Sequence, residues 1–217
     1  MAPEADLREA VVAAGRRLRA AGLVAATEGN LSVRIGADQL LITPSGRRKD
    51  ELVPAELLIV AAAAGDGGGA MPGARPSSDV AIHRAVYAAR PDVGAVVHAH
   101  LPAAMGLTVA GEIPDPDALP ETKLFLGSLP FLAFGQPGSD ELAGRVAAAL
   151  RTPADDDGRL PVAVLLERHG AVAVGLGDGA KAVSEAVDRL ELVEVLCRTW
   201  RDALLVRAAR GQAGPPA

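Results

Sequence analysis

Hydrophobic residues recur at helical spacing in the first twenty positions of the chain. Leu7, Val11 and Leu18 fall on one face of a 3.6-residue repeat, with polar residues between them. The pattern predicts an amphipathic helix over residues 6–21, which Gly22 ends.

Short apolar runs bounded by turn residues predict strands in the following segments. "NLSVRI" and "QLLIT", parted by Gly36-Ala37-Asp38, are typical of a β-hairpin. Residues 93–100 are rich in valine and lie between two prolines, which favours a further strand. "VAVLLERHG" and "AVAVG" predict two more strands around a turn at His169-Gly170.

Three more helices are expected between and after these strands. One should open at Ser77-Ser78-Asp79, where serine can cap free N–H groups and aspartate suits the positive helix end, and Pro91 should stop it after Arg90. Others are expected over residues 139–151 and, capped by Asp178, from 180 to about 209. Residues 61–76 and 112–120 are expected to be loops, and residues 210–217 a disordered tail. Mixed strands and helices without a boundary predict one α/β domain over residues 1–217.

Composition narrows the class of protein. Hydrophobic residues make up 49% of the 217 residues but aromatic residues only 2%, so the core must consist of alanine, valine and leucine, which suits α/β layers. The net charge of −5 with scattered lysine and arginine argues against nucleic-acid or membrane-surface partners. The single cysteine, Cys197, excludes an intrachain disulfide framework. No apolar signal-peptide segment or span-length stretch is seen, so a cytoplasmic location is expected.

Three of the four histidines lie where strands are expected to end. His98 and His100 are two residues apart on a strand, so both imidazoles face the same side and could hold one metal ion. His169 ends another strand and could face the same pocket, giving the three neutral imidazoles common in catalytic zinc sites. The alternatives are two unrelated histidines at a strand end and a turn histidine bonded to backbone.

A carboxylate and several small polar residues supply further candidates. Asp79 could serve only as a helix-dipole partner. His83, one helical turn further on, is expected to pack or hydrogen-bond rather than bind metal. Three pairs, each also explicable as an ordinary turn or cap, could together cradle a phosphate through their small side chains and open backbone N–H groups. These pairs are Gly29-Asn30, Ser45-Gly46 and Ser77-Ser78.

Four motifs taken in order resemble the class II aldolase/adducin family. They are "EGNLSVR", "LLITPSG", "RPSSDVAIHRAVYAARPDVGAVVHAH" and "ERHGAVAVG". The resemblance runs from about Gly22 to Trp200. It implies a three-layer α/β/α sandwich with a mixed, largely antiparallel central sheet, and a cyclic homotetramer with active sites between subunits. It also implies a divalent metal, usually zinc, with Mn²⁺ or Co²⁺ as substitutes.

The resemblance also assigns roles to residues. His98, His100 and His169 match the family's metal ligands, and the three Gly/Ser/Asn pairs match its phosphate-binding positions. Asp79 stands where aldolase members have an acid/base glutamate and epimerase members an aspartate that approaches the metal. Members use tyrosines across a subunit boundary, whereas the one tyrosine here, Tyr87, lies inside a helix. A substitute acid or base could come from the loop that contains Asp115, Asp117, Glu121 and Lys123.

The expected function is that of a metal-dependent aldolase. It would cleave or form a C–C bond in a small phosphorylated ketose or hydroxyketone through a metal-stabilised enediolate, with an aldehyde as the second reactant. The alternatives within the family are a sugar-phosphate 4-epimerase, a dehydratase and a decarboxylase. The alternatives outside catalysis are an adducin-like module and a metal-free anion-binding module, which robust metal binding would exclude.

Overall fold

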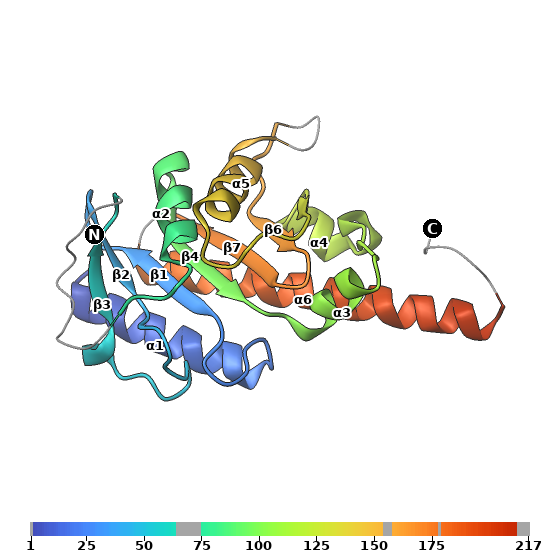
Figure 1. Cartoon of the computed structure of the whole chain (residues 1–217), viewed down its shortest axis with the longest axis horizontal. Coiled ribbons are helices and arrows are strands. Elements are labelled where there is room, and N and C mark those ends of the chain that lie inside the picture. The colour runs from blue at the N-terminus through green and yellow to red at the C-terminus, as the bar shows by residue number, and fades with distance from the viewer. Residues whose placement is uncertain (1, 64–74, 154–157, 178, 212–217) are drawn as a thin grey trace.

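A mixed β-sheet with helices on both faces makes up the protein (Figure 1). The computed structural model describes residues 2–63, 75–153, 158–177 and 179–211. Within these ranges the sheet has seven strands in the order β3-β2-β1-β4-β7-β6-β5. Every neighbouring pair is antiparallel except β5 and β6. The expected three-layer α/β/α sandwich with a largely antiparallel sheet is thus confirmed.

The strands come from short apolar segments of the chain. The expected first hairpin is present, with Val33 opposite Leu41. The strands are β1 (Asn30–Arg34), β2 (Gln39–Ile42), β3 (Leu58–Ala61), β4 (Val93–Ala99), β5 (Phe131–Leu132), β6 (Ala163–Leu166) and β7 (Gly170–Leu176). The central strands β4 and β7 are buried on both faces, which explains their continuous apolar sequence.

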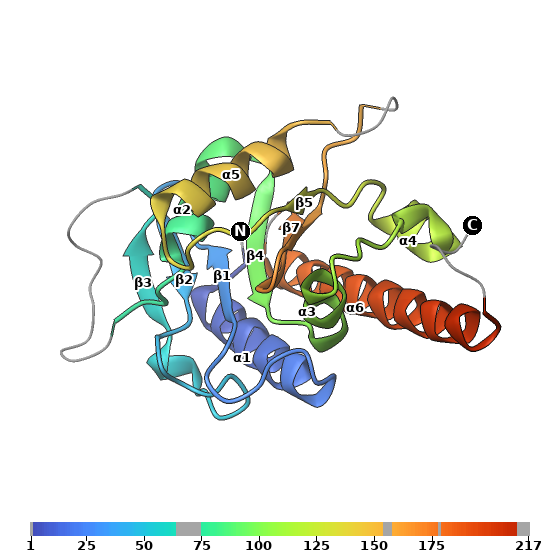
Figure 2. The same ribbon diagram turned by 45° about the vertical axis from the view of Figure 1, so that its right-hand side comes forward.

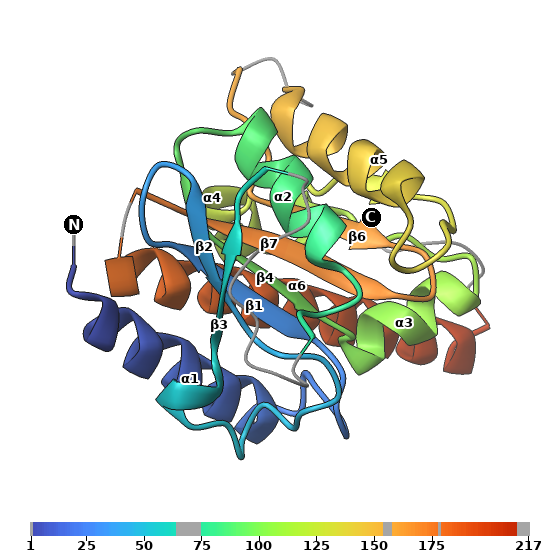
Figure 3. The same cartoon turned by 60° about the vertical axis from the view of Figure 1, so that its left-hand side comes forward.

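Two pairs of helices cover the two faces of the sheet (Figure 3). One face carries α1 (Glu4–Ala20) and α6 (Gly179–Ala209), which pack on each other and on β1, β4 and β7. The opposite face carries α2 (Val80–Ala89) and α5 (Asp140–Arg151). The shorter helices α3 (Pro102–Val109) and α4 (Pro120–Phe125) lie beside α6 (Figure 2).

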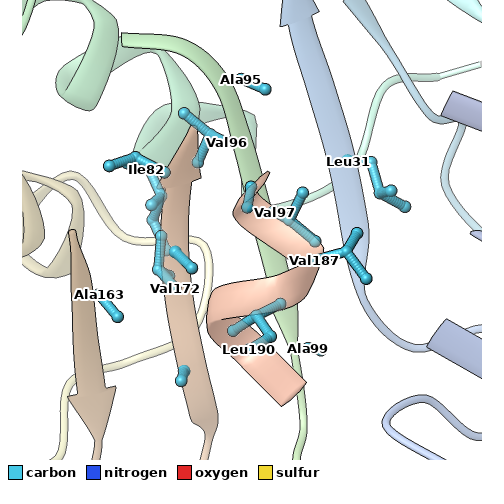
Figure 4. Packing of buried hydrophobic residues seen from close by; sticks show 14 of the residues in the cluster. Leu31, Ile82, Ala95, Val96, Val97, Ala99, Ala163, Val172, Val187 and Leu190 are labelled. Atoms are coloured by element: carbon cyan, nitrogen blue, oxygen red, sulfur yellow. The ribbon is translucent and has the colours of Figure 1, made fainter. Parts of the chain in front are cut away.

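Alternation along β4 divides the core into two halves. Figure 4 shows Val97 on the side of Val187 and Leu190 of α6, and Val96 on the side of Ile82 of α2. All five side chains are fully buried. Since His98 follows Val96 at strand spacing, it faces the α2 side of the sheet, away from the layer of α6.

Several sequence-based expectations need correction. The serines do not cap α2: the helix begins at Val80, Asp79 precedes it, and the Ser77 hydroxyl instead accepts from the Asp79 N–H at 3.3 Å. The supposed loop over residues 112–120 contains a 3₁₀ turn (Pro116–Ala118) and runs directly into α4.

The elements α3, α4, β3 and β5 were not expected, because each is short and lacks a clear period. The first helix begins two residues earlier than expected and the second ends one residue earlier, at Ala89. The cap expected at Asp178, most of the loop over residues 61–76 and the tail beyond residue 211 lie outside the described residues. Among the described helices, none combines the length and the apolar character needed to cross a bilayer.

Candidate active site

The three candidate metal ligands converge at one end of the central strand pair. His98 and His100 come from the end of β4, and His169 immediately precedes β7, which pairs with β4 through Ala99 and Ala171. One ring nitrogen of each histidine lies within 4.8 Å of the others. The ring centroids are 4.7–5.2 Å apart. The register of one antiparallel pair therefore assembles the set that the sequence suggested.

Hydrogen bonding leaves ring nitrogens of this set free to bind a cation. The Nδ1 atom of His98 lies 3.0 Å from the carbonyl oxygen of Ala171, which can only accept, so Nδ1 carries the proton and Nε2 keeps its lone pair. The Nε2 of His98 and the Nδ1 of His169 are buried and have no hydrogen-bond partner. Such buried unpaired nitrogens are costly unless something binds them, and a divalent ion fits this donor set.

Burial favours the neutral form of His98 and His169, which is the form that a metal requires. Burial, reinforced by the neighbouring His169 and His100, lowers the pKa of His98 to about 3. Burial also lowers the pKa of His169, although Asp79 opposes this shift. Two of the three candidate ligands therefore need lose no proton before they bind an ion at neutral pH.

The carboxylate of Glu28 lies close to the ring of His100. Its Oε1 atom lies 3.4 Å from the Nδ1 atom of His100. A carboxylate on one ring nitrogen favours the tautomer that offers the other nitrogen to a metal. Glu28 stands within the quoted "EGNLSVR" motif, but only the fold shows that it reaches His100.

Two backbone features fix the chain around these ligands. Gly170 has φ +96°, and a Cβ atom there would lie 2.1 Å from the Ala99 carbonyl oxygen and 2.6 Å from the His100 Cα. Only glycine therefore lets the turn after His169 press against the β4 end. Directly after His100, Leu101 has φ +22° and leads into α3.

A buried carboxylate from α6 anchors the start of α3. Glu194 is 2% exposed, and its side-chain oxygens accept from the N–H groups of Ala103 and Ala104 at 3.1–3.4 Å. It also pairs with Arg198 at 2.9 Å. In the sequence, the spacing of four between Glu194 and Arg198 is that of an ordinary exposed helix pair, so no signal indicated this support.

Asp79 lies beside the histidines with both carboxylate oxygens occupied. Its Oδ2 accepts from the side-chain amide of Asn30 at 3.0 Å, and its Oδ1 accepts from the Gly138 N–H at 3.1 Å. Burial alone would raise the pKa of Asp79. The charge that His98 and His169 carry when protonated and the Asn30 hydrogen bond outweigh burial, and the pKa lies below its usual value. Asp79 is therefore an ionised acceptor at neutral pH and more than a helix-dipole partner.

The six Gly, Asn and Ser residues suggested for phosphate come from three segments, which we call the anion cradle. A β-bridge joins Pro44 to Pro76, and the Ser45 N–H donates to the Arg75 carbonyl at 2.8 Å. The segment with Ser45 and Gly46 therefore lies beside that with Ser77 and Ser78. Gly29 approaches β4 closely, since a Cβ atom there would lie 2.9 Å from the His98 carbonyl oxygen.

Members of the anion cradle differ in what they can offer a ligand. Ser45, Gly46 and Ser78 are exposed. The Asn30 side chain is buried and is already bonded at both ends, to Asp79 and to His83. Ser77 is buried and accepts from the Asp79 N–H.

A buried lysine beneath the anion cradle was missed by sequence reasoning. Lys49 is 2% exposed, and its Nζ donates to the carbonyl oxygens of Thr27 at 2.9 Å and Arg47 at 2.7 Å. Burial lowers its pKa to about 8. It ties the loop before Gly29 to the loop after Gly46. In "GRRKD" it is one of three adjacent basic residues, and nothing in the pattern distinguishes it from the two arginines.

The remaining candidates are bonded to groups other than the three histidines. Tyr87 is buried, and its hydroxyl lies 2.9 Å from the Ser32 hydroxyl. Lys123 pairs with Asp117 at 2.7 Å on the surface of α4 and the turn before it. His83 is fully buried and hydrogen-bonded, as expected of a histidine that is not a ligand.

Comparison with known proteins gives the family. The model of the class II aldolase and adducin N-terminal domain matches residues 9–201. The 5-methylthioribulose-1-phosphate/5-deoxyribulose-1-phosphate aldolase of Rhodospirillum rubrum is 37% identical over 90% of this chain and 80% of its own. A methylthioribulose-1-phosphate dehydratase of Acidiphilium cryptum is 34% identical over 86% of this chain and 85% of its own.

A solved structure supports the same assignment. The L-fuculose-1-phosphate aldolase of Thermus thermophilus superposes with a TM-score of 0.77 at 34% identity, over 98% of this chain and 100% of that chain. Together with the converging histidines, these similarities show that the chain belongs to the class II aldolase and adducin family.

Proposed function

We propose that the protein is a metal-dependent aldolase that cleaves or forms a C–C bond in a small phosphorylated ketose, with an aldehyde as the other reactant. One observation carries the proposal: three imidazoles, two with unpaired buried nitrogens, lie beside the ionised Asp79. The names of the Rhodospirillum and Thermus relatives, both aldolases of sugar phosphates, support the substrate class.

In this proposal the ion is held by His98, His100 and His169. Zinc is the expected ion, with Mn²⁺ or Co²⁺ as substitutes. A bound divalent ion polarises the substrate carbonyl and stabilises the negative charge that develops on oxygen. Imidazole ligands in the neutral form would add no charge of their own, so the charge of the ion would remain available to the substrate.

We assign the proton transfer to Asp79. It is ionised at rest, so in the condensation direction it can take the proton that the attacking carbon must lose. In the cleavage direction the hydroxyl that becomes the aldehyde carbonyl loses a proton, and Asp79 would accept it and deliver it to the carbon freed when the C–C bond breaks. Its bonds to Asn30 and Gly138 fix the carboxylate in place before the substrate arrives.

The anion cradle would hold the phosphate at the non-reacting end of the substrate. Backbone N–H groups and hydroxyls at Gly29, Ser45, Gly46, Ser77 and Ser78 suit a phosphate, and Asn30 would contribute through Asp79 instead. Binding at that end orients the reacting carbons at the ion. We further propose that each chain folds as a single domain over residues 1–217, and that four chains form a homotetramer in the cytoplasm.

A second candidate is a dehydratase, which the similarity to the Acidiphilium enzyme favours. Such an enzyme would use the same ion and base but would expel water instead of an aldehyde.

Metal analysis and product analysis test the proposal together. Protein purified without chelators is expected to carry about one equivalent of a transition metal per chain, and His98→Ala to carry far less. Incubation with ribulose and fuculose phosphates should release an aldehyde, whereas tetronate phosphates test for the other reactions of the family. Release of water without C–C cleavage would identify the dehydratase. Protein without metal that does not respond to added zinc would contradict both.

A further inference from the structure

A chain of buried polar side chains runs from Asp79 into the core between β1 and α2. The Asn30 amide bonds Asp79 at 3.0 Å and His83 at 2.5 Å. The other ring nitrogen of His83 lies 2.6 Å from the Ser32 hydroxyl, which lies 2.9 Å from the Tyr87 hydroxyl. None of the five side chains belongs to a residue more than 6% exposed.

The spacing of two regular elements builds this chain. Asn30 and Ser32 are two residues apart on β1 and so share one face. Asp79, His83 and Tyr87 are four residues apart along the start and body of α2 and share one helical face. The strand and the helix thus contribute alternate members.

The ionised Asp79 at one end sets the direction of the bonds along this chain. An ionised Asp79 can only accept, so the end of the Asn30 amide that faces it must be the NH₂ group. The oxygen of that amide then faces His83, whose Nε2 must carry a hydrogen. Complete burial lowers the pKa of His83 to about 4, so the ring is neutral and its Nδ1 is bare.

The remaining two bonds follow from the bare Nδ1. The Ser32 hydroxyl must donate to it, because no hydrogen is left on that nitrogen. The Ser32 oxygen can then accept from the Tyr87 hydroxyl at 2.9 Å, which is a shorter contact than the 3.4 Å from that hydroxyl to the Gly94 carbonyl oxygen. Each bond therefore points from Tyr87 towards Asp79, and no member lacks a partner.

We propose that Tyr87, Ser32 and His83 are positioning residues that fix the Asn30 amide with its NH₂ group towards Asp79. The inference rests on the proposed function in one respect only: Asp79, which accepts from the Asn30 NH₂ group, is taken to be the base. Without the chain the amide could turn by 180°, and its oxygen would then face the Asp79 carboxylate and repel it. The chain therefore makes an N–H donor a permanent partner of the proposed base.

The opposite direction would also satisfy most of these groups, and it makes the proposal testable. If the Asn30 oxygen faced Asp79, the amide NH₂ would donate to His83 Nε2, and His83 would carry its hydrogen on Nδ1. The two directions thus differ in the tautomer of one histidine, which the nitrogen-15 chemical shifts of the ring distinguish.

The first experiment reads that tautomer in the metal-free protein with nitrogen-15-labelled histidine at neutral pH. Loss of one set of signals in His83→Gln assigns His83 among the four histidines. We expect the Nε2–H form. An Nδ1–H ring or a charged imidazolium would overturn the proposal. The measurement needs neither metal nor substrate, so it remains decisive if the protein proves not to be an aldolase.

The second experiment removes the donor that favours a bare His83 Nδ1. In Ser32→Ala only the Asp79 carboxylate still favours the Nε2–H form, so we expect a fraction of His83 to take the Nδ1–H form. With the metal-loaded protein we expect kcat to fall about tenfold while KM and metal content stay near wild type. Thr122→Val on α4 is the matched control: it removes a buried hydroxyl that donates to the Pro116 carbonyl of the preceding 3₁₀ turn, and it should keep both the tautomer and kcat. A Ser32→Ala protein with mixed tautomers and wild-type kcat would contradict the positioning role.

Discussion

The three histidines and the anion cradle lie close together but are held in different ways. The histidines sit on or next to two central strands, and the register of β4 with β7 brings them together. The cradle comes from three loop or helix-start segments joined by one β-bridge and by Lys49. The metal end is therefore expected to fail when any one ligand is removed, whereas the cradle spreads its contribution over many small contacts.

The largest effect is expected at the metal end. His169→Ala should abolish tight metal binding and lower kcat/KM by more than about 100-fold, since even changes in outer-shell partners cost ~10–100-fold in metal affinity or activity. Metal content by elemental analysis checks this. His83→Gln is the matched histidine control and should keep its metal. Equal loss of metal from both variants would show that folding, and not ligation, had failed.

The next effect is expected from the lysine that joins the cradle loops. Lys49→Met keeps the length of the buried side chain but removes both bonds to backbone carbonyls. We expect KM for a phosphorylated substrate to rise about tenfold, equivalent to about 1.4 kcal/mol, with metal content unchanged. Lys181→Met, at an 84% exposed side chain on α6, serves as the control. If Lys49→Met also lost its metal, the three histidines and the anion cradle could not be treated as separately held regions.

Lys49 should also make stability depend on pH. Its pKa is about 8 in the folded protein and about 10.5 in the unfolded chain, so the unfolded state binds more protons between these values. The free energy of unfolding of wild type, relative to Lys49→Met, should therefore rise by about 2 kcal/mol from pH 7 to pH 10. Urea unfolding of both proteins at several pH values measures it. If the free energy of unfolding changed with pH in the same way in both proteins, the lowered pKa of Lys49 would be ruled out.

The smallest effect is expected at a single exposed member of the cradle. Ser45→Ala removes one hydroxyl, and an exposed hydrogen bond contributes about 0.5–1 kcal/mol, so KM should rise about threefold with kcat and metal content unchanged. Ser184→Ala, on the exposed face of α6, should change nothing. A loss of kcat in Ser45→Ala would place this loop closer to the reacting atoms than the comparison implies.

The parts of the structure that follow from a periodic sequence pattern were the most predictable. The alternation in residues 93–100 placed His98 and His100 on one face, and the strand on each side of His169 followed from continuous apolar runs. Contacts between distant segments were not predictable from pattern. Neither Glu194 nor Lys49 differs in sequence from a solvated charge, and each becomes buried only because another element covers it. The serines before α2 were misassigned because a cap and a loop contact require the same residue types.

The turn at Gly170 carries a consequence for any redesign of the metal preference. Imidazole at positions 98, 100 and 169 can in principle be exchanged for thiolate or carboxylate, since each of these also offers one ligand atom from a side chain. Position 170 permits no such exchange, because the main chain of β4 already occupies the volume that a side chain would need. An engineer can therefore vary which atoms hold the ion far more freely than the path of the chain that presents them.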